Sequence, residues 1–397
     1  MKILFVTSTP IEYSSSGNMR NVALINGLIK LGHEVQLLTS EADKNNILYD
    51  ESLLSSKITK RYYIPLGNIH KKFSYSEYQN KAILTVKKYI YKTLSGLSLY
   101  DPRKGLVNQL DRVKIDEKFE LIISSSDPKS SHLIAEKLID SHKNISNKWV
   151  QYWGDPFSND INKQSKLPSF FIKKEEKRLI GLSDFVVYVS PFTLEEQISK
   201  FKIYKEKMFF IPVPYITPIE YDETKNSKFV LGYFGDYYSK DRDILPLYNS
   251  ACKLHQSIDL IVYGNSDVDL KSNKTITINV REKASSIKKV ESKCDLLVCI
   301  LNKKGTQIPG KIYHYAATNK PILIIVDGDY KERMKEYLLK YDRYYVCNND
   351  ENSIVNAVNE INASYRKIKY KPSKYFNSTE IASKFIDLFN KTISFTK

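Results

Sequence analysis

The chain has 397 residues, of which 42% are hydrophobic and 27% are charged, proportions typical of a globular protein. This length is greater than that of a typical domain with a single hydrophobic core, so two domains are predicted. No apolar run approaches the roughly 18 residues of a membrane-spanning helix, and the apolar run at residues 1–6 is too short for a signal peptide.

The formal net charge of +16 indicates an anionic partner, such as nucleic acid, anionic lipid or a phosphate-bearing substrate. Residues 57–104 hold eleven Lys and Arg, only two acids, and eight Tyr and Phe. Basic residues interleaved with aromatics suit an anionic membrane surface; the alternative is a solvated helix that its lysines keep soluble. Nucleic acid is disfavoured because no nucleic-acid-binding motif accompanies the charge.

The four cysteines show no paired spacing, which argues against a zinc site and a disulfide framework. We expect reduced thiols in a cytoplasmic protein.

Short leucine-rich and β-branched runs alternate with amphipathic helical patterns in the first half of the chain, which is typical of a parallel sheet covered by helices. A helix is predicted at 18–31, and another begins at Ser190-Pro191, a cap followed by a proline in the first turn. Strands are predicted at 3–7, 34–39, 60–65, 120–124, 149–153 and 185–190.

Three prolines within 212–218, followed by a polar run, predict a semi-extended linker. We therefore expect a first domain at 1–210, a linker at 211–227 and a second domain at 228–375, with a terminal helix within 376–397. The second domain repeats the alternating pattern and predicts a second doubly wound sheet. Its strands are predicted at 229–235, 258–263, 275–280, 296–301, 322–326 and 344–347.

Ligands of open α/β sheets bind at the carboxyl ends of the strands, so the loops after the strands are the candidate sites. The most informative is 305–317, predicted as a loop that enters a helix between two buried strands. A helix N-terminus there offers free N–H groups and a partial positive charge to phosphate, and Lys311 adds a cation.

Other loops carry further candidates, each with a purely structural alternative. Gly17 and Asn18 suit either ligand contact or a turn glycine with a helix-capping Asn, and His132 suits either ligand contact or packing within a helix. Asp155 suits either the binding of a hydroxyl proton or an Asx turn. Lys240 and Arg242 suit either a diphosphate or a solvated loop whose acids neutralise them.

The run Pro309-Gly310-Lys311-Ile312-Tyr313-His314-Tyr315 resembles the donor-binding segment of GT-B glycosyltransferases. The likeness is to the retaining glycosyltransferase family 4 and its capsule, exopolysaccharide and lipopolysaccharide branch. One departure is that His314 stands where many members carry the second of two glutamates, with the first near Thr306 or Gln307. Because histidine offers one acceptor at most, donor affinity or identity is expected to differ.

The resemblance implies an α/β fold of two doubly wound Rossmann-like domains that face an interdomain cleft, with the terminal helix crossing back to the first domain. It implies metal-independent, retaining transfer of a sugar from a nucleotide sugar to a glycan or lipid-linked acceptor, in bacterial surface polysaccharide synthesis. No cofactor is implied, and the expected location is the cytoplasm or the inner face of the plasma membrane.

Carried onto this sequence, the resemblance assigns three groups of site residues. The catalytic candidates are Asp155, Lys240, Arg242 and Lys311. The donor-binding candidates are Gly17, Gly235, Tyr263, Gly264, Gln307, Ile308, Pro309, Gly310, Lys311 and His314. The acceptor-binding candidates are Asn18, Ser126, Asp127 and His132.

Other functions stay open at this point. His314 and the single glycine at Gly17 are compatible with a non-catalytic nucleotide-sugar-binding subunit. A GT-B epimerase would need acid–base pairs that the sequence does not reveal. A dinucleotide oxidoreductase is disfavoured because no G-x-G-x-x-G follows a strand.

Overall fold

The computed structural model describes residues 1–391 apart from 47, 54–56, 68–89, 91–92, 94–95, 143 and 162–164. Most of the basic and aromatic run at 57–104, including Lys87, Lys88 and Lys92, lies outside the described residues. Membrane contact through that run therefore stays a prediction.

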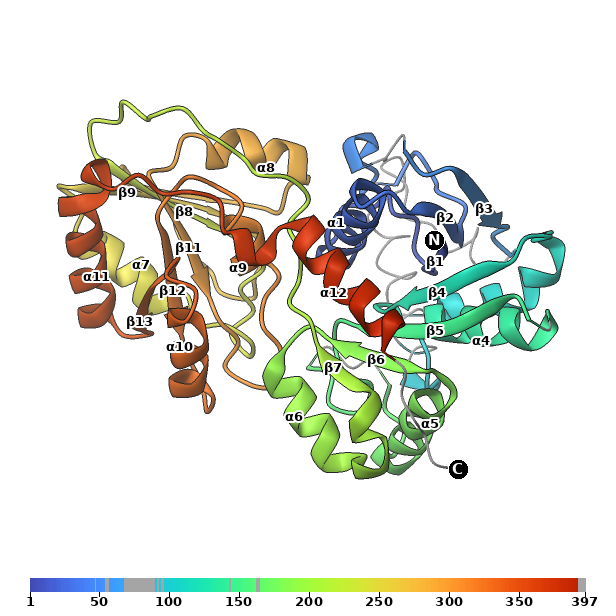
Figure 1. Ribbon diagram of the computed structural model, residues 1–397. Helices are drawn as coiled ribbons and strands as arrows, with labels where there is room; N and C mark the ends of the chain where they lie inside the picture. Colours follow the sequence, from blue (N-terminus) through green and yellow to red (C-terminus); the bar gives the residue numbers. More distant parts are fainter. Residues whose placement is uncertain are drawn as a thin grey trace. The chain divides into compact units, whose positions relative to one another are not determined.

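The chain forms two compact units, one of residues 1–216 with 378–397 and the other of residues 217–377. Each is built around a parallel sheet with helices between successive strands (Figure 1). The predicted α/β class with two doubly wound sheets is confirmed. The boundary at 216–217 falls inside the segment predicted as the linker.

The sheet of unit 1 has seven parallel strands in the order β3-β2-β1-β4-β5-β6-β7. All six predicted strands are present, and β7 is an additional strand too short for its apolar run to stand out. The strands are β1 (Lys2–Val6), β2 (Glu34–Ser40), β3 (Lys60–Ile64), β4 (Phe119–Ser125), β5 (Ser146–Trp153), β6 (Phe185–Tyr188) and β7 (Met208–Phe210). The helices are α1 (Ser16–Lys30), α4 (Ser130–Ser141), α5 (Ser169–Leu182), α6 (Pro191–Lys200) and α12 (Ser378–Asn390), with 3-10 turns η1 (Glu51–Leu53), η2 (Pro102–Arg112) and η3 (Lys202–Lys207).

Unit 2 has six parallel strands in the order β10-β9-β8-β11-β12-β13. The strands are β8 (Phe229–Phe234), β9 (Ile258–Tyr263), β10 (Ile276–Asn279), β11 (Leu296–Ile300), β12 (Ile322–Val326) and β13 (Tyr345–Asn348). The helices are α7 (Leu245–Lys253), α8 (Ala284–Glu291), α9 (Lys311–Tyr315), α10 (Lys331–Leu339) and α11 (Glu351–Ser364), with 3-10 turns η4 (Tyr365–Lys367) and η5 (Lys374–Phe376). Central strands such as β11 and β12 are buried throughout, as their continuous apolar runs predict.

Helix α12 belongs to unit 1 although unit 2 separates it from the rest of that unit in the chain. It packs on α1, drawn in red beside dark blue in Figure 1. Phe385 is fully buried and meets the Tyr152 ring edge-on at 4.9 Å. Gly27 permits this packing, because a Cβ atom there would lie 2.0 Å from the Ser378 carbonyl oxygen.

The two connections of unit 2 to the rest of the chain meet at the end of α9. The N–H of Ile219 donates to the carbonyl of Ala317 at 2.8 Å, and the N–H of Ser373 donates to the carbonyl of Ala316 at 2.8 Å. The segments by which the chain enters and leaves unit 2 are thus held by hydrogen bonds to two neighbouring carbonyl groups.

Candidate functional site

In the sheet of unit 2, the order in which successive strands are added reverses at the neighbouring strands β8 and β11. Strands β9 and β10 lie on one side of this pair, and β12 and β13 lie on the other. Ligands of doubly wound folds bind at the carboxyl ends of the strands at such a switch point. The loops that leave β8 and β11 there are 235–244 and 301–310. Together they carry half of the predicted donor-binding residues, and Lys311 and His314 follow directly in α9.

In the first loop, Arg242 turns toward the protein and Lys240 turns away. The Arg242 Nη1 atom donates to the Asp236 carbonyl oxygen at 2.8 Å. The Lys240 side chain is 71% exposed, with its Nζ atom 3.8 Å from Asp241. The structure therefore favours Arg242 over Lys240 as a fixed cation, since a half-buried guanidinium is already held in place.

Arg242 and Lys311, although distant in sequence, follow the two strands of the switch point, because Arg242 lies in the loop after β8 and Lys311 begins the helix after β11. Burial raises the pKa of the Cys299 thiol to about 11, and both cations act on it in the opposite direction. Cys299 is the penultimate residue of β11, so both positive charges influence a group near the carboxyl end of this strand. The sequence predicted both residues for the site but could not show that the strands before them are neighbours.

The predicted helix after the second loop is α9, which is only five residues long. Gln307 and Ile308 are buried in the loop, and Pro309 and Gly310 lead into the helix. The Asn302 side-chain amide donates to the Gln307 carbonyl at 3.3 Å and so braces this loop against the end of β11.

Lys311 and His314 of α9 share one partner that the sequence did not reveal, the fully buried Glu291 of α8. The Lys311 Nζ atom lies 3.8 Å from Glu291 Oε1, and the His314 Nε2 atom lies 3.5 Å from Oε2. Tyr221 also donates its hydroxyl to Oε2 at 3.0 Å. Burial alone would raise the pKa of Glu291, but His314, Lys311 and Tyr221 lower it to about 2.

This network changes the interpretation of His314. According to the resemblance to GT-B glycosyltransferases, His314 replaces a glutamate at a donor-binding position. In the structure its ring faces a buried carboxylate, and a glutamate there would bring two carboxylates together. Histidine at 314 is therefore compatible with the buried Glu291 carboxylate, whereas a glutamate there is not.

Gly235 and Gly264 follow adjacent strands and touch. A Cβ atom on Gly264 would lie 2.0 Å from the Gly235 carbonyl oxygen, so no larger residue fits. The Gly235 N–H donates to the Tyr263 carbonyl at 2.8 Å, which places Tyr263 beside the same loop. Asp236 completes the arrangement by pairing with Arg281 at 3.0 Å.

In unit 1 the corresponding switch point lies between β1 and β4. Here Lys129 holds two carboxylates, since its Nζ atom pairs with Asp127 and lies 2.5 Å from Asp160 Oδ2. Burial works to lower the pKa of Lys129, but the surrounding carboxylates raise it above its ordinary value. The side chain thus stays cationic in a buried position.

Asp155 follows β5 and lies within the electrostatic reach of this cluster. Burial, together with the charges of Asp127 and Asp160, raises the pKa of the Asp155 carboxyl to about 8. A carboxyl that holds a proton near neutrality can exchange it with a bound hydroxyl. The sequence singled out Asp155 and Asp127 but missed Lys129 and Asp160, whose contribution depends on the fold.

Arg20 of α1 was also missed, because on sequence it is one more charge on an amphipathic helix. It is buried, donates from Nη2 to Ser125 Oγ at 3.1 Å, and stacks over the Tyr152 ring at 4.6 Å. Arg20 adds a fixed positive charge beside Asp155.

The start of α1 differs from the alternative in which Asn18 caps the helix. Helix α1 begins at Ser16, and Ser15 is its cap, accepting from the Asn18 N–H at 3.2 Å. Asn18 lies inside the helix and donates its amide to the carbonyls of Pro10 and Tyr13. The alternative in which Asn18 caps the helix is therefore wrong, because Ser15 starts the helix earlier. Gly17 lies in the first turn, and a Cβ there would have ordinary contact with the Asp127 carbonyl.

Ser126 and His132 are both fully buried. Ser126 accepts from the Gly154 N–H at 3.2 Å and so joins the loops after β4 and β5. His132 lies on α4 against the Trp153 ring, with its Nδ1 atom 2.7 Å from Ser124 Oγ. The structure favours the packing interpretation of His132.

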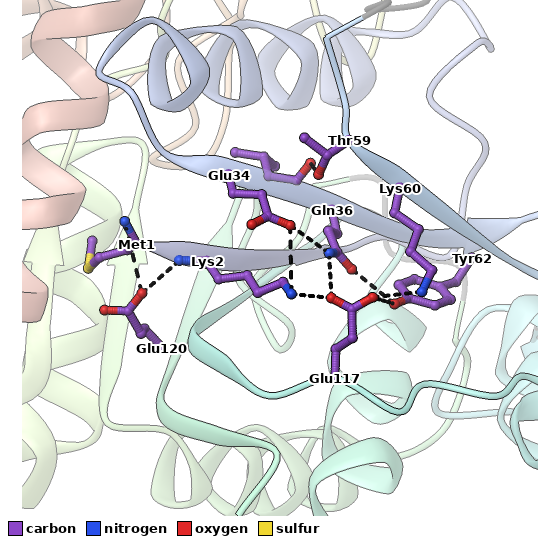
Figure 2. Close-up of polar contacts among 10 residues, drawn as sticks. Met1, Lys2, Glu34, Gln36, Thr59, Lys60, Tyr62, Glu117 and Glu120 are labelled. Atoms are coloured by element: carbon purple, nitrogen blue, oxygen red, sulfur yellow. Dashed lines mark hydrogen bonds and ion pairs between the residues drawn. The ribbon is translucent and has the colours of Figure 1, made fainter.

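Another charge cluster of unit 1 lies at the opposite ends of the strands, at the amino ends of β1, β2 and β3. Figure 2 shows Lys2, Gln36, Lys60 and Tyr62 gathered around Glu117. Hydrogen bonds from Lys2, Lys60 and Gln36 hold the pKa of Glu117 well below its usual range. The cluster ties three strands to the loop before β4 and is structural, because it lies away from the carboxyl ends of the strands.

Over the part of the chain that the structure describes, no group of three or more His, Cys, Asp or Glu is placed to hold a metal ion. Within the same residues, no helix combines the length and apolar character needed to span a bilayer. The four cysteines are unpaired with one another, and three of them are buried.

No protein-family model matches the chain, and no curated protein matches its sequence. Similar solved structures are glycosyltransferases that match almost end to end. The catalytic domain of starch synthase IV from Arabidopsis thaliana, bound to ADP and acarbose, aligns over 98% of both chains with a TM-score of 0.60 at 10% identity. An α-glucosyltransferase in complex with UDP and DNA aligns over 98% of this chain and 100% of its own, with a TM-score of 0.58 at 12% identity.

The lipopolysaccharide outer core galactosyltransferase WaaB also aligns, over 98% of this chain and 99% of its own, with a TM-score of 0.50 at 11% identity. Two parallel sheets in one chain, together with these alignments, define the GT-B fold. At such low identity the likeness shows the fold alone.

Proposed function

We propose that the chain is a glycosyltransferase that transfers a sugar from a nucleoside-diphosphate sugar to an acceptor hydroxyl. The observation that carries this proposal is the presence of two cations, Arg242 after β8 and Lys311 at the start of α9, in the segments that follow the two strands of the unit 2 switch point. Two cations there suit a diphosphate, whose negative charge grows as the sugar–phosphate bond breaks. The similar structures with UDP and with ADP support a nucleotide donor.

In this proposal Arg242 and Lys311 stabilise the leaving diphosphate, and Glu291 holds Lys311 and His314 in place. The Asp155 carboxyl is the candidate for contact with a hydroxyl of the bound sugar or acceptor. The charge stabilisation comes from protein side chains, so we propose that transfer requires no metal.

The finer assignments rest on the sequence resemblance. We propose retention of configuration and an acceptor that is a glycan or a lipid-linked glycan in bacterial surface polysaccharide synthesis. The likeness to WaaB supports this setting. Contact with an anionic membrane surface through 57–104 belongs to the same proposal.

The first test is a thermal-shift panel of UDP, GDP, ADP and CMP, with and without EDTA. A ligand that binds only the native state raises the unfolding temperature, so the responding nucleotide identifies the base. We expect Lys311→Ala and Arg242→Ala to weaken the binding of that nucleotide by roughly 10- to 100-fold, because each removes a charged hydrogen bond. Lys240→Ala, in the same loop, is the matched control and is expected to bind nearly normally.

Two outcomes would count against the proposal in different ways. If no nucleotide shifts the unfolding temperature, the site assignment fails. If a nucleotide binds but its sugar conjugate is not turned over with any glycan acceptor, the competing hypothesis of a non-catalytic nucleotide-sugar-binding subunit is favoured.

A further inference from the structure

A groove of about 520 Å³ lies on unit 1 between α5 and the turn η3, away from both strand-end clusters. Its lining combines lysines with large apolar side chains and contains no acid. The residues that define this basic apolar patch are Phe170, Lys173, Lys174 and Lys177 of α5 with Lys202 and Ile203 of η3.

The α5 residues of the patch recur at positions i, i+3, i+4 and i+7, so they share one face of the helix. The opposite side of α5 is the buried one and carries Ile172 and Leu179. The acids of α5 turn away from the patch. Glu175 pairs with Arg178 at 2.8 Å, and the fully buried Glu176 accepts the N–H groups of the loop after β5.

The apolar members of the patch are unusually exposed. Phe170 is 67% exposed and Ile203 is 71% exposed, and the neighbouring Phe171 is 52% exposed. The Phe170 and Phe171 rings contact each other at 5.7 Å between centroids. Large apolar side chains that stand out of a surface mark a place of contact with another apolar phase or partner.

The lysines of the patch are available to an anionic partner. Among the described residues, Lys173, Lys174, Lys177 and Lys202 have no ion-pair partner, while the nearby Lys200 is paired with Glu196 at 3.2 Å. Four cations without counter-charges, next to protruding aromatic and aliphatic groups, match the surface of an anionic bilayer. Lysines there contact lipid phosphates, and Phe and Ile enter the acyl boundary.

We propose that this patch docks unit 1 onto an anionic lipid bilayer. The proposal is independent of the glycosyl-transfer reaction. It also differs from the predicted contact through 57–104, because it rests on α5 and η3. An acidic protein partner would use the lysines but has no need for three exposed apolar side chains.

The test is cosedimentation of the full chain with vesicles of phosphatidylcholine alone or mixed with phosphatidylglycerol. We expect binding only to the mixed vesicles. The triple variant Lys173→Glu, Lys174→Glu, Lys177→Glu should lose at least tenfold in affinity for them. Its control, Lys225→Glu, Lys271→Glu, Lys274→Glu, makes the same change of net charge at exposed positions of unit 2 and should bind within about twofold of wild type.

A second pair of variants tests the apolar side chains. Phe170→Ser with Ile203→Ser should weaken binding severalfold, whereas Val280→Ser with Leu339→Ser, also exposed, should not. The proposal is overturned if both patch variants bind vesicles as their controls do, which would leave 57–104 as the contact, or if wild type binds no vesicle. Nucleotide-induced thermal shifts on the same proteins report separately on folding and on the donor site.

Discussion

At the scale of single residues, the Glu291 network explains why histidine suits position 314. A fully buried carboxylate is tolerated only when cations and donors surround it, and His314, Lys311 and Tyr221 supply these. The network connects α8 to α9 at the candidate donor site. Substitution of its members is therefore expected to change both the stability of the fold and the binding of the donor.

The variant His314→Glu tests this interpretation. We expect its free energy of unfolding to fall by about 2–4 kcal/mol, because a second carboxylate replaces the partner of a buried one. Adding Glu291→Gln should recover most of the loss, and His314→Gln, which removes the pair without adding repulsion, should fall in between. Urea unfolding measures all four proteins. A His314→Glu variant as stable as wild type would refute this interpretation.

A second residue-scale prediction concerns Asp155 and pH. Its pKa is raised from an ordinary 3.8 to about 8, so between these values the folded state keeps a proton that the unfolded chain has released. Stability must therefore fall as pH rises through that window. Asp155→Asn removes this slope. The free energy of unfolding of the variant, relative to that of wild type, should therefore rise by about 2–4 kcal/mol from pH 5 to pH 9.

The measurement is the free energy of unfolding of both proteins across that pH range. Asp111→Asn is the control, since the Asp111 side chain is 72% exposed and should leave the pH slope unchanged. Parallel profiles for wild type and Asp155→Asn would show that Asp155 ionises normally.

At the scale of elements, the contact of α1 with α12 depends on one missing side chain. We expect Gly27→Ala to lower the free energy of unfolding by about 1–3 kcal/mol, because its methyl group would push α12 off α1. Gly17→Ala in the same helix has ordinary contacts and should be neutral or slightly stabilising. Urea unfolding, with hydrogen exchange of α12 to locate the effect, makes the comparison. A Gly27→Ala variant as stable as Gly17→Ala would refute the dependence of the α1–α12 contact on the missing side chain.

The elements themselves were largely predictable from the sequence. Buried central strands such as β11 and β12 are continuous apolar runs, and the Ser190-Pro191 cap starts α6 as expected. Strand β7 was not predictable, because three residues give no periodicity. The sequence also could not show that α9 ends after five residues.

The candidate site was predictable only in part, for a physical reason. Arg242 and Asp155 stand in loops after apolar runs and Lys311 begins the helix after another, where a sequence motif can mark them. Glu291, Arg20 and Lys129 acquire their importance from partners brought near by folding. Their burial and charge environment follow from topology and register, which no local pattern contains.

At the scale of the whole molecule, the division into units predicts which pieces of the chain fold alone. Unit 2 is one continuous segment, 217–377, with its own core, so we expect it to unfold cooperatively when expressed by itself. Residues 1–216 lack α12 and would expose the apolar groove that Phe385 fills. We expect that fragment to aggregate, and its fusion through a Gly/Ser linker to 378–397 to be soluble and cooperative.

Circular dichroism and size-exclusion chromatography of the three proteins provide the measurement. A fragment 1–216 that unfolds as cooperatively as the fusion would mean that α12 contributes little to unit 1.

The return of the chain to unit 1 also sets an order of events during synthesis. A ribosome adds roughly 5–20 residues per second, so between the end of β7 and the start of α12 on the order of ten to thirty seconds pass. Throughout that interval the surface of α1 and Tyr152 that α12 covers is exposed in the nascent protein, whereas unit 2 has its whole sequence as soon as Asn377 is added. The unit that is translated first is consequently the last to be completed, and a nascent-chain chaperone would have its longest-lived target there.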